Sequence, residues 1–451
     1  MKLKNYAVIL ASGLGSRFLS DLPKQFAKIA GKTVMEHTIK IFEESDKIDE
    51  IILVVTPLYQ YLVKEILLKN NFKKIKKILN GGETRQDSSA IGVNSITDKE
   101  ANVIIHDCAR PFLSHRIIDD CVEALKKYDA IDVAIPSADT IIEIEDNIII
   151  DIPERDNLRR GQTPQCFKLS LIKKAHEIAK NDKSFTDDCG IIVKNQLAKI
   201  FVVNGDNENI KITYPNDIDI ADKLFQTRNI SLSNTYSLEN LNNKVIVVFG
   251  GTSGIGKSIV DLAIKYNAKV FPLSLSIGCD IKSYKIVEEN LSKIYSETGK
   301  IDYVVNSAGI LKMGKLTDRS IDDIKEDIEV NYIGSINVAK ASIPYLKETN
   351  GGLLFFTSSS YTRGRALYSI YSSTKAGISN LTQALAEELV FDKVRVNAIS
   401  PERTATPMRL QAFGKENNNT LLDPKVVAKK SLEVLVSDIN GEIVSIRKSK
   451  Y

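Results

Sequence analysis

The sequence predicts an α/β protein with two doubly wound domains. Two segments each begin with an apolar strand, pass through a glycine-rich turn and continue as an amphipathic helix: YAVILASGLGSRF at 6–18 and KVIVVFGGTSGIGKSIV at 244–260. After each segment, apolar strand-like runs alternate with helix-length segments, which is typical of a parallel sheet covered by helices on both faces. The 451 residues are about twice what one hydrophobic core usually holds, so two Rossmann-like domains are expected.

The first domain is expected over residues 1–227. Its opening strand is followed by the apolar runs IILVVT, NVIIHD and DVAIP, with helix-length amphipathic segments between them. The next stretch, QTRNISLSNTYSLENLNNK, is rich in Asn and Ser and has little apolar periodicity. Residues 228–243 are therefore expected to form a linker.

The second domain is expected over residues 244–451. Its strand-like runs after the glycine-rich turn are KVFPLSL, IDYVVNSAG, GGLLFFTSS and VRVNAIS. The glycines of the two opening turns are spaced differently, so the duplication of one domain does not explain the two halves.

Composition and charge argue against several classes of protein. Hydrophobic residues make up 43% and charged residues 26%, which is typical of a folded globular chain, and the net charge of +4 is too small to indicate a nucleic-acid surface. No apolar run approaches the roughly 20 residues that span a bilayer, and the N-terminus lacks a signal-peptide pattern. Five scattered cysteines indicate neither disulfides nor structural zinc. We expect a cytoplasmic protein that binds small molecules and neither nucleic acid nor membrane.

The glycine-rich turn of the first half predicts a phosphate site. Glycines let backbone N–H groups approach phosphate oxygens, and two cations follow within one loop, Arg17 of the ASGLGSRF block (11–18) and Lys24 of the PKQF block (23–26). Such a turn alone is equally often a tight strand-to-helix corner. Five further blocks stand downstream: GGETRQDS at 81–88, HDCARPF at 106–112, TPQ at 163–165, TDD at 186–188 and NIKIT at 209–213.

In order and spacing, these blocks resemble the cytidylyltransferases that couple CTP to methylerythritol phosphate or ribitol 5-phosphate. The resemblance covers about residues 3–225. It implies that Gly13, Gly15 and Arg17 contact the CTP phosphates. It also implies that Lys24 and Lys211 join Arg17 in stabilising charge at the α-phosphorus.

The resemblance implies the other contacts of this site as well. Arg85 and Ser88 would border the cytosine and ribose, and Asp107 would hold Mg²⁺. Thr140, Arg155 and the TDD run would lie toward the acceptor phosphate. For Thr140 and Arg155, an ordinary surface role is an equally good interpretation.

The glycine-rich turn of the second half predicts a dinucleotide site. Gly250, Gly254 and Gly256 have G-x-x-x-G-x-G spacing between a strand and a helix, which lets a pyrophosphate reach the helix N-terminus. Downstream stand NSAG at 306–309, Asn331, Ser358, a Y-x-x-x-K pair and SPERTATPM at 400–408. Together these features resemble the short-chain dehydrogenase/reductases over about residues 244–410.

One of the two tyrosines in YSIYSSTK (368–375) is expected to be a proton donor. Lys375 lies four residues after Tyr371, on the same helix face, whereas Tyr368 has a serine at that offset. This cation, helped by the positive charge of an oxidised nicotinamide, is expected to lower the pKa of Tyr371 from its usual value near 10. The resemblance implies that Ser358 binds the same carbonyl oxygen, that Lys375 also holds the ribose and that Asn331 orders a relay water.

The resemblance also implies a set of cofactor contacts in this half, which are Gly250, Gly254, Ile255, Gly256, Asp280, Ile281, Asn306, Ala308, Gly309 and Thr406. An acidic residue at the end of the second strand normally selects NAD, but Ser274 occupies that position. We therefore expect NADP(H). Lys257 either binds the extra phosphate or is a solvated helix residue.

A reductase joined to a cytidylyltransferase suggests consecutive steps. The combination resembles the bifunctional ribulose 5-phosphate reductase/CDP-ribitol pyrophosphorylases of bacterial capsule and teichoic-acid-type pathways. The expected reactions are reduction of D-ribulose 5-phosphate by NADPH and then cytidylyl transfer from CTP, with Mg²⁺, to give CDP-ribitol. At least one of four arginines is expected to bind the ketose phosphate: Arg363, Arg365, Arg403 and Arg409.

Two alternatives stay open. The transferase could act on methylerythritol phosphate beside a reductase of unrelated substrate, or the chain could be an inactive nucleotide-binding scaffold. The complete sets of candidate catalytic residues in both halves favour enzymes. A homodimer is expected, because both families usually self-associate.

Overall fold

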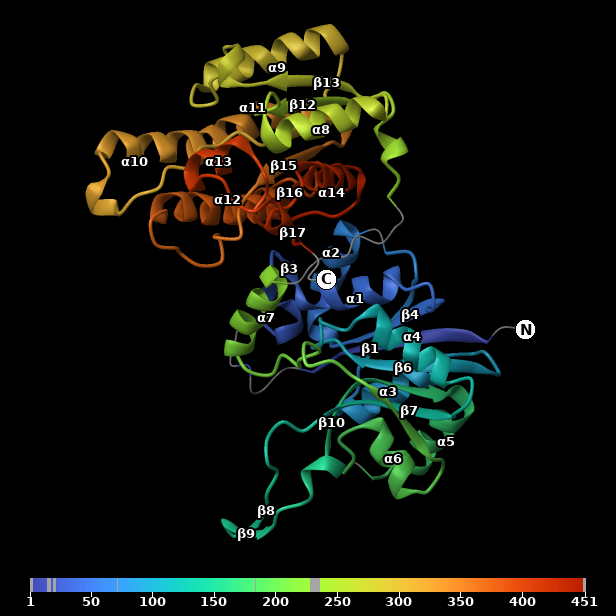
Figure 1. Cartoon of the computed structure of the whole chain (residues 1–451). Helices are drawn as coiled ribbons and strands as arrows, with labels where there is room; N and C mark the ends of the chain where they lie inside the picture. Colours follow the sequence, from blue (N-terminus) through green and yellow to red (C-terminus); the bar gives the residue numbers. More distant parts are fainter. Residues whose placement is uncertain are drawn as a thin grey trace. The chain divides into compact units, whose positions relative to one another are not determined.

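The computed structural model describes residues 3–13, 18, 22–70, 72–182, 184–227 and 236–448. The chain divides into two compact units, Met1–Leu224 and Phe225–Tyr451, each with its own sheet and core (Figure 1). None of the described helices combines the length and the apolar character needed to cross a bilayer.

A seven-stranded sheet in the order β11-β7-β10-β6-β1-β4-β5 forms the centre of the first unit. Strand β10 runs antiparallel to both neighbours and the other six are parallel. The strands are β1 (Lys4–Ala11), β4 (Glu50–Val55), β5 (Ile75–Asn80), β6 (Ala101–Asp107), β7 (Ala130–Pro136), β10 (Arg159–Lys168) and β11 (Ile200–Asn204). The chain leaves β1 toward β4 and later returns to β6 on the other side of β1. A topological switch point, where open α/β sheets bind ligands, therefore lies between β1 and β6.

Helices cover both faces of this sheet, because successive side chains of a strand point to opposite sides. In β1, Ile9 belongs to the core formed with α1, α2 and α4, whereas Val8 belongs to the core formed with α3, α5 and α6. The helices are α1 (Val34–Glu44), α2 (Gln60–Lys69), α3 (Arg85–Asn94), α4 (His115–Ala124), α5 (Leu169–Ile178), α6 (Asp188–Lys194) and α7 (Asn216–Thr227).

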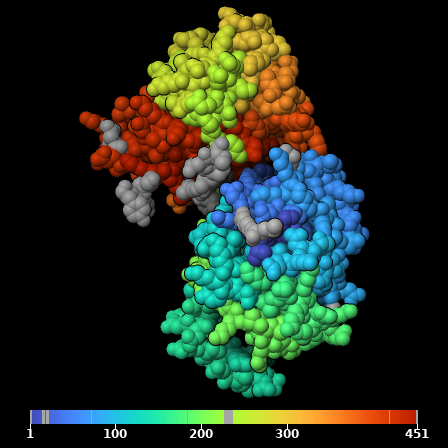
Figure 2. Space-filling view, turned by 90° about the vertical axis from the view of Figure 1, so that its right-hand side faces the viewer, coloured from blue at the N-terminus to red at the C-terminus, as the bar shows by residue number. Residues whose placement is uncertain are grey.

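Two hairpins leave the first sheet. Strand β2 (Lys28–Ile29) pairs with β3 (Lys32–Thr33), and β8 (Glu143–Glu145) pairs with β9 (Ile148–Asp151). The β8–β9 hairpin stands away from the body of its unit in Figure 1, and its surface is teal in the space-filling view of Figure 2. Every residue from 140 to 152, a segment we call the arm, is exposed.

The second unit has a parallel six-stranded sheet in the order β13-β12-β14-β15-β16-β17. Its switch point lies between β12 and β14. The strands are β12 (Val245–Phe249), β13 (Lys269–Leu273), β14 (Tyr303–Asn306), β15 (Gly352–Phe356), β16 (Arg395–Pro401) and β17 (Ile443–Ile446).

Helices also cover both faces of the second sheet. One core contains side chains of α9, α11 and α12, and the other contains side chains of α8 and α14. The helices are α8 (Gly254–Lys265), α9 (Tyr284–Thr298), α10 (Ile321–Ile328), α11 (Gly334–Thr349), α12 (Ser369–Glu388), α13 (Pro407–Phe413) and α14 (Pro424–Val436). A π-helical turn, η7 (Glu329–Ile333), joins α10 to α11.

The predicted fold class, two doubly wound α/β domains, is confirmed. The apolar runs identified in the sequence all contain strands. The first sheet differs from the expected parallel arrangement because β10 is antiparallel. The expected linker lies among the described residues only at 236–243. There Leu238 and Leu241 pack into the core of the second unit.

Candidate active sites

The first candidate site lies at the carboxyl ends of β1 and β6. Gly13 follows β1, and a Cβ there would meet no atom of a described residue within 4 Å. The buried Gln25 amide donates hydrogen bonds to the carbonyls of Ala11 (2.9 Å) and Gly13 (3.2 Å), which secures the turn to the next segment. Gly15 and Arg17 lie outside the described residues.

Two lysines from distant parts of the sequence meet beside Asp107, the last residue of β6. The Lys24 ammonium donates to the Ile212 carbonyl (2.8 Å), and the Lys211 ammonium lies 2.7 Å from Asp107 Oδ2. The Ile212 N–H donates to the Ala109 carbonyl (2.8 Å). The NIKIT segment therefore runs along the end of β6 and places Lys211 at the switch point.

Asp107 is held between two cations. Arg85 Nε donates to Asp107 Oδ1 (3.0 Å), and Arg85 Nη1 donates to Asp188 Oδ2 (2.8 Å). Burial alone would raise the pKa of Asp107, but Arg85 and Lys211 outweigh it and hold that pKa far below its usual range. The same competition between burial and Arg85 brings the pKa of Asp188 to about 2. Both carboxylates are therefore ionised throughout the working pH range.

Ser88 is fully buried, and its hydroxyl joins two loops. It lies 2.7 Å from the Ser12 hydroxyl, accepts from the Gly82 N–H (3.1 Å) and donates to the Thr84 carbonyl (3.0 Å). Thr84 in turn caps α3, the helix that begins with Arg85. Ser88 thus links the end of β1 to the loop that positions Arg85.

Thr140 and Arg155 flank the β8–β9 hairpin, and both are exposed. Neither side chain is hydrogen-bonded or ion-paired to the residues around Asp107 in the part of the chain that the structure describes. The structure therefore brings together Lys24, Arg85, Asp107, Lys211 and the TDD run. Thr140 and Arg155 remain beside the β8–β9 hairpin.

The second candidate site is a cavity of about 510 Å³ in the second unit. The glycine-rich turn after β12 forms one wall. A side chain at Gly256 would lie 2.2 Å from the Gly250 carbonyl oxygen and 2.4 Å from Ser307 Oγ, and Gly250 itself has a φ of +78°. These glycines are required for close contact between the turn and β14, which leaves the N-terminus of α8 facing the cavity.

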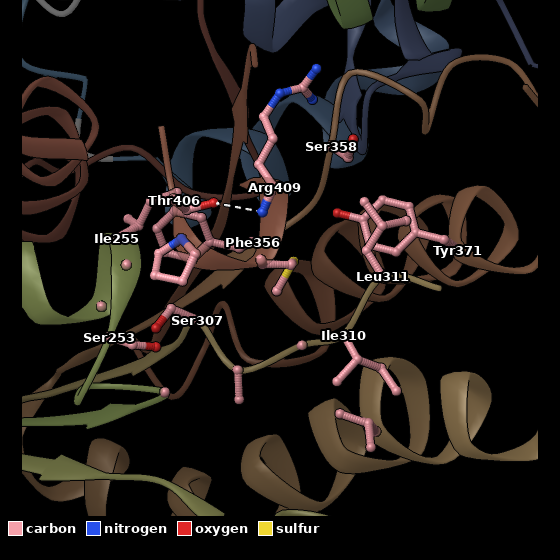
Figure 3. Close-up of a pocket in the computed structure, with 18 of the residues that line it drawn as sticks. Ser253, Ile255, Ser307, Ile310, Leu311, Phe356, Ser358, Tyr371, Thr406 and Arg409 are labelled. Atoms are coloured by element: carbon pink, nitrogen blue, oxygen red, sulfur yellow. Dashed lines mark hydrogen bonds between the residues drawn. The ribbon is translucent and has the colours of Figure 1, made fainter. Parts of the chain in front are cut away.

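Of the four catalytic residues predicted in the second half, three line this cavity: Ser358, Tyr371 and Lys375. Figure 3 shows the Tyr371 hydroxyl directed into it, with Ser358 on the neighbouring wall. The Lys375 ammonium donates to the Phe356 carbonyl (2.8 Å) and lies 5.6 Å from the centre of the Tyr371 ring. Burial lowers the pKa of Lys375 to about 8.

The expected lowering of the Tyr371 pKa is not found in the chain by itself. Burial raises the pKa of Tyr371 to about 12, and the Ser358 hydroxyl only partly opposes that rise. Lys375 does not offset the burial, because its ammonium is directed to the Phe356 carbonyl. A neutral phenol is the form suited to donating a proton.

The fourth residue, Asn331, is fully buried in the π-helical turn η7. Its side chain accepts from the Ile310 N–H (2.9 Å) and donates to the Ile310 carbonyl (2.9 Å). A side chain at Gly309 would lie 2.9 Å from Asn331 Oδ1 and 3.6 Å from the Lys375 ammonium nitrogen. Asn331 thus fixes the loop after β14 close to Lys375.

Nine of the ten expected cofactor contacts line the cavity, and Asn306 is instead buried beside it. At the end of β13, the Ser274 hydroxyl accepts from Thr252 (3.0 Å) and lies 2.8 Å from the Ser276 hydroxyl. Lys257 is exposed, pairs with Asp261 (3.0 Å) and does not line the cavity.

Three of the four candidate phosphate-binding arginines also line the cavity: Arg365, Arg403 and Arg409. Arg363 is exposed and is not part of the lining. Arg409 donates to both carboxylate oxygens of Glu416, at 2.6 and 2.9 Å, and its backbone N–H donates to Thr406 Oγ1 (Figure 3).

Known proteins resemble each half of the chain separately. A family model described as 2-C-methyl-D-erythritol 4-phosphate cytidylyltransferase matches residues 6–227, and one described as short chain dehydrogenase matches residues 272–417. A 2-C-methyl-D-erythritol 4-phosphate cytidylyltransferase of Clostridium perfringens is 41% identical over 49% of this chain and 97% of its own length. The solved 4-diphosphocytidyl-2C-methyl-D-erythritol synthase of Anaerococcus prevotii, 31% identical, covers 50% of this chain and 99% of its own, with a TM-score of 0.45.

One relative resembles the whole chain. The bifunctional ribulose 5-phosphate reductase/CDP-ribitol pyrophosphorylase of Haemophilus influenzae is 46% identical over 99% of this chain and 96% of its own length. The present chain belongs to this bifunctional family. It has a cytidylyltransferase domain and a short-chain dehydrogenase domain, so it is both a nucleotidyltransferase and an oxidoreductase that uses a nicotinamide cofactor.

Several residues of the family blocks have structural roles that the sequence did not assign. Gln25 of the PKQF block secures the first glycine turn, and Thr163 of the TPQ block accepts the Asp107 N–H (3.1 Å). Arg110 of the HDCARPF block donates to the Asn209 carbonyl (2.8 Å) and so holds the NIKIT segment. Their position within the family blocks was the one feature of the sequence that could have identified these residues. Among the described residues, no group of three or more His, Cys, Asp or Glu side chains is arranged to hold a metal ion.

Proposed function

We propose that this enzyme makes CDP-ribitol in two steps. The second unit reduces D-ribulose 5-phosphate with NADPH to D-ribitol 5-phosphate, and the first unit transfers the cytidylyl group of CTP to it and releases pyrophosphate. The main support is the 46% identity to the bifunctional relative across 99% of the chain. We assign the two activities to residues 1–227 and 244–451, joined by a linker at 228–243.

Cytidylyl transfer requires stabilisation of charge and no protein nucleophile. A phosphate oxygen of ribitol 5-phosphate attacks the α-phosphorus of CTP, the bond to the β-phosphate oxygen breaks, and pyrophosphate leaves with the electron pair. We assign Lys24, Lys211 and Arg17 to the developing negative charge. The ion pairs of Asp107 support this assignment, because they hold Lys211 at the switch point before substrates bind.

We propose that Asp107 also holds Mg²⁺ together with CTP. The residues fit this ion, because Asp107 stays ionised and its oxygens have acceptor capacity beyond the two cations. One protein carboxylate suffices for Mg²⁺, which takes its other ligands from phosphates and water. When bound, the ion would supply positive charge to the triphosphate. Gly13 and Gly15 would contact the same phosphates, and Arg85 and Ser88 would border the nucleoside.

Reduction requires a proton donor at the ketone oxygen. NADPH, when bound, supplies the hydride. We propose that Tyr371 donates the proton, that Ser358 hydrogen-bonds the same oxygen and that Lys375 holds the cofactor ribose near Tyr371. Asn331 would order a water on the route by which Tyr371 regains its proton. The neutral phenol of Tyr371 supports this direction of proton transfer.

We propose NADP(H) as the cofactor of the second unit. The hydroxyls of Thr252, Ser274 and Ser276 cluster at the end of β13, where a carboxylate would otherwise bind ribose hydroxyls and repel a 2′-phosphate. Lys257 is less suited than expected as the partner of that phosphate, since it is paired with Asp261.

We further propose a cytoplasmic homodimer whose partners are small molecules. The arm supports self-association because it exposes seven isoleucines, which are Ile141, Ile142, Ile144, Ile148, Ile149, Ile150 and Ile152. Exposed apolar patches of this kind mark contact surfaces. Thr140 is the first residue of the arm and Arg155 follows it closely, so their proposed contact with the acceptor phosphate would depend on the same association.

The test is a single-pot assay that follows NADPH oxidation and pyrophosphate release together. With ribulose 5-phosphate, NADPH and CTP, both signals are expected. Without CTP, only NADPH oxidation should remain. Without NADPH, pyrophosphate should appear only after ribitol 5-phosphate is added. Pyrophosphate release with methylerythritol phosphate but not with ribitol 5-phosphate would favour the first alternative, and no turnover in either half would favour an inactive scaffold.

A further inference from the structure

Strand β7 carries one charged side chain on a face otherwise occupied by alanine and proline. Ala130, Asp132 and Ala134 share this face, because alternate residues of a strand point the same way. Val103 and Ile105 of β6 and Phe167 of β10 belong to the core on this side of the sheet. By the same alternation, Asp107 and Gln165 face that side too. Asp107, Gln165 and Asp132 therefore lie on one face of three adjacent strands.

An irregularity in the middle strand connects Asp132 with the transfer site. The pairing of β10 with β7 shifts register between Gln162 and Cys166, which is characteristic of a bulge. Within this bulge, Thr163 accepts the Asp107 N–H, and the Gln165 amide donates to Asp132 Oδ1 (3.2 Å) and Asp187 Oδ2 (2.9 Å). Asp132 is two strand spacings, about 10 Å, from the strand of Asp107.

The orientation of the Gln165 side chain is fixed by its other hydrogen bonds. Its amide oxygen accepts from the backbone N–H groups of Asp188 (3.0 Å) and Cys189 (3.4 Å), so its NH₂ group must face the two carboxylates. The same α6 N-terminus presents Asp188, which pairs with Arg85. Gln165 thus holds Asp132 in a fixed position relative to the transfer site.

One oxygen of Asp132 remains open. Oδ1 accepts from the Val133 N–H (2.9 Å) and from Gln165, whereas no described residue donates to Oδ2. The neighbour on that side is Gly161, which has no side chain, and even a Cβ there would be 3.9 Å from Oδ2. Burial and the neighbouring Asp187 carboxylate raise the pKa of Asp132 to about 6, and Gln165, the Val133 N–H and the charge of Arg110 only partly oppose that rise. A half-buried carboxylate oxygen without a donor is a favourable acceptor for a ligand hydroxyl.

We propose that Asp132 selects the alditol chain of the acceptor, with Oδ2 accepting a hydrogen bond from one of its hydroxyls. This inference rests on the proposed function of the first unit. The acceptor phosphate reacts beside Asp107 and Lys211, and the polyhydroxyl chain extends over the β10 bulge toward Asp132. Gln165 and Asp187 act as positioning residues for this carboxylate. A shorter, methyl-branched alditol phosphate offers fewer hydroxyls to the same oxygen.

The first test compares Asp132→Ala and Asp132→Asn with Asp129→Asn in the full chain. Asp129 is exposed just before β7 and provides a matched control. We expect Asp132→Ala to lower kcat/KM for ribitol 5-phosphate about 10- to 100-fold, as for loss of a hydrogen bond to a charged group. The KM for CTP and the rate of ribulose 5-phosphate reduction should stay unchanged, as should all rates of Asp129→Asn. An unchanged kcat/KM in both Asp132 variants would overturn the proposal.

The second test removes the hydroxyl instead of the carboxylate. Ribitol 5-phosphate analogues that each lack one hydroxyl are assayed with the unaltered chain and with Asp132→Ala. For one analogue, the two losses should not add, because either change alone removes the same hydrogen bond. If the losses add for every analogue, Asp132 does not bind the acceptor. If the unaltered chain uses methylerythritol phosphate and not ribitol 5-phosphate, the proposed function itself is wrong, and this inference falls with it.

Discussion

The Lys211 ammonium lies 2.7 Å from Asp107 Oδ2, although 104 residues separate them in the sequence. This ion pair places a cation at the switch point of the first sheet in the protein alone. Asp107 is also paired with Arg85, so it would keep one cationic partner if Lys211 moved to a phosphate. We propose that the Lys211 ammonium leaves the Asp107 carboxylate and contacts the reacting phosphate when the substrates bind.

Removal of the Lys211 ammonium should impair cytidylyl transfer and leave ketone reduction unchanged. We expect Lys211→Met to lower kcat for cytidylyl transfer about 10²- to 10³-fold, the usual loss for one group that stabilises developing charge. Ribulose 5-phosphate reduction should continue at the normal rate. Lys199→Met, which removes an exposed lysine, is the matched control. Pyrophosphate release and NADPH oxidation measured on the same sample would separate the two activities, and equal loss of both would contradict the assignment.

The two tyrosines of YSIYSSTK should differ sharply. Tyr371→Phe should abolish ketone reduction, because the proton donor is lost, while transfer to supplied ribitol 5-phosphate continues. Tyr368 contacts the rings of Tyr371 and Phe413, each with a centroid distance of 6.3 Å, and Tyr368→Phe preserves both contacts. The rate of ketone reduction by the Tyr368→Phe variant should stay within about threefold of the rate of the unaltered chain, as expected when only packing is involved. Loss of both activities in a folded Tyr371→Phe protein would contradict two separate sites.

Cofactor choice should respond to one substitution at the end of β13. We expect Ser274→Asp to lower kcat/KM for NADPH and raise it for NADH, because a carboxylate repels the 2′-phosphate and accepts from free ribose hydroxyls. Lys257→Ala should leave both values unchanged, since that lysine is paired with Asp261 outside the cavity. Initial rates with the two cofactors give the comparison. A stronger effect of Lys257→Ala would assign the phosphate to the helix instead.

The ketose phosphate should depend on arginines of the cavity wall. At least one of Arg365→Ala, Arg403→Ala and Arg409→Ala is expected to raise the KM for ribulose 5-phosphate about tenfold or more, because a charged hydrogen bond is lost. Arg363→Ala removes a nearby exposed arginine outside the lining and should have no effect. If none of the three single substitutions changes this KM, none of these arginines binds the phosphate.

Lys375 should affect stability with a defined pH dependence. Its folded-state pKa is lowered to about 8, so between pH 8 and 10 the unfolded chain binds more protons than the folded one. Stability contributed by this group therefore rises with pH across that window. Relative to Lys375→Met, the unaltered chain should gain about 2 kcal/mol between pH 8 and pH 10. Urea unfolding at the two pH values measures this difference, and a constant difference would contradict the lowered pKa.

The fold and the catalytic sets could be predicted because they depend on local patterns. The glycine turns, the apolar strands and the offset between Tyr371 and Lys375 each involve residues close in sequence. The antiparallel direction of β10 could not be predicted in this way. Its pairing joins strands that are far apart along the chain, and no local pattern specifies the direction of such a pair.

The remaining differences arise from burial and from competing partners. The pKa of Tyr371 was expected to fall because Lys375 is near in sequence, but the phenol is buried and the ammonium is directed to Phe356. Lys257 has the right charge for a phosphate, and its pairing with Asp261 is visible only in the folded chain. Residue spacing identifies neighbours, whereas the three-dimensional environment determines which neighbour is bound.

The π-helical turn around Asn331 limits how this enzyme can change over evolutionary time. A π-helical turn contains one residue more than an α-helical turn, so it cannot be removed by a simple exchange of side chains. Deletion of one residue within Glu329–Ile333 would remove the extra residue of this turn and change the direction in which the Asn331 side chain points. Its paired hydrogen bonds to Ile310 would then be lost. Side chains in this stretch can therefore vary among descendants, but its length should not.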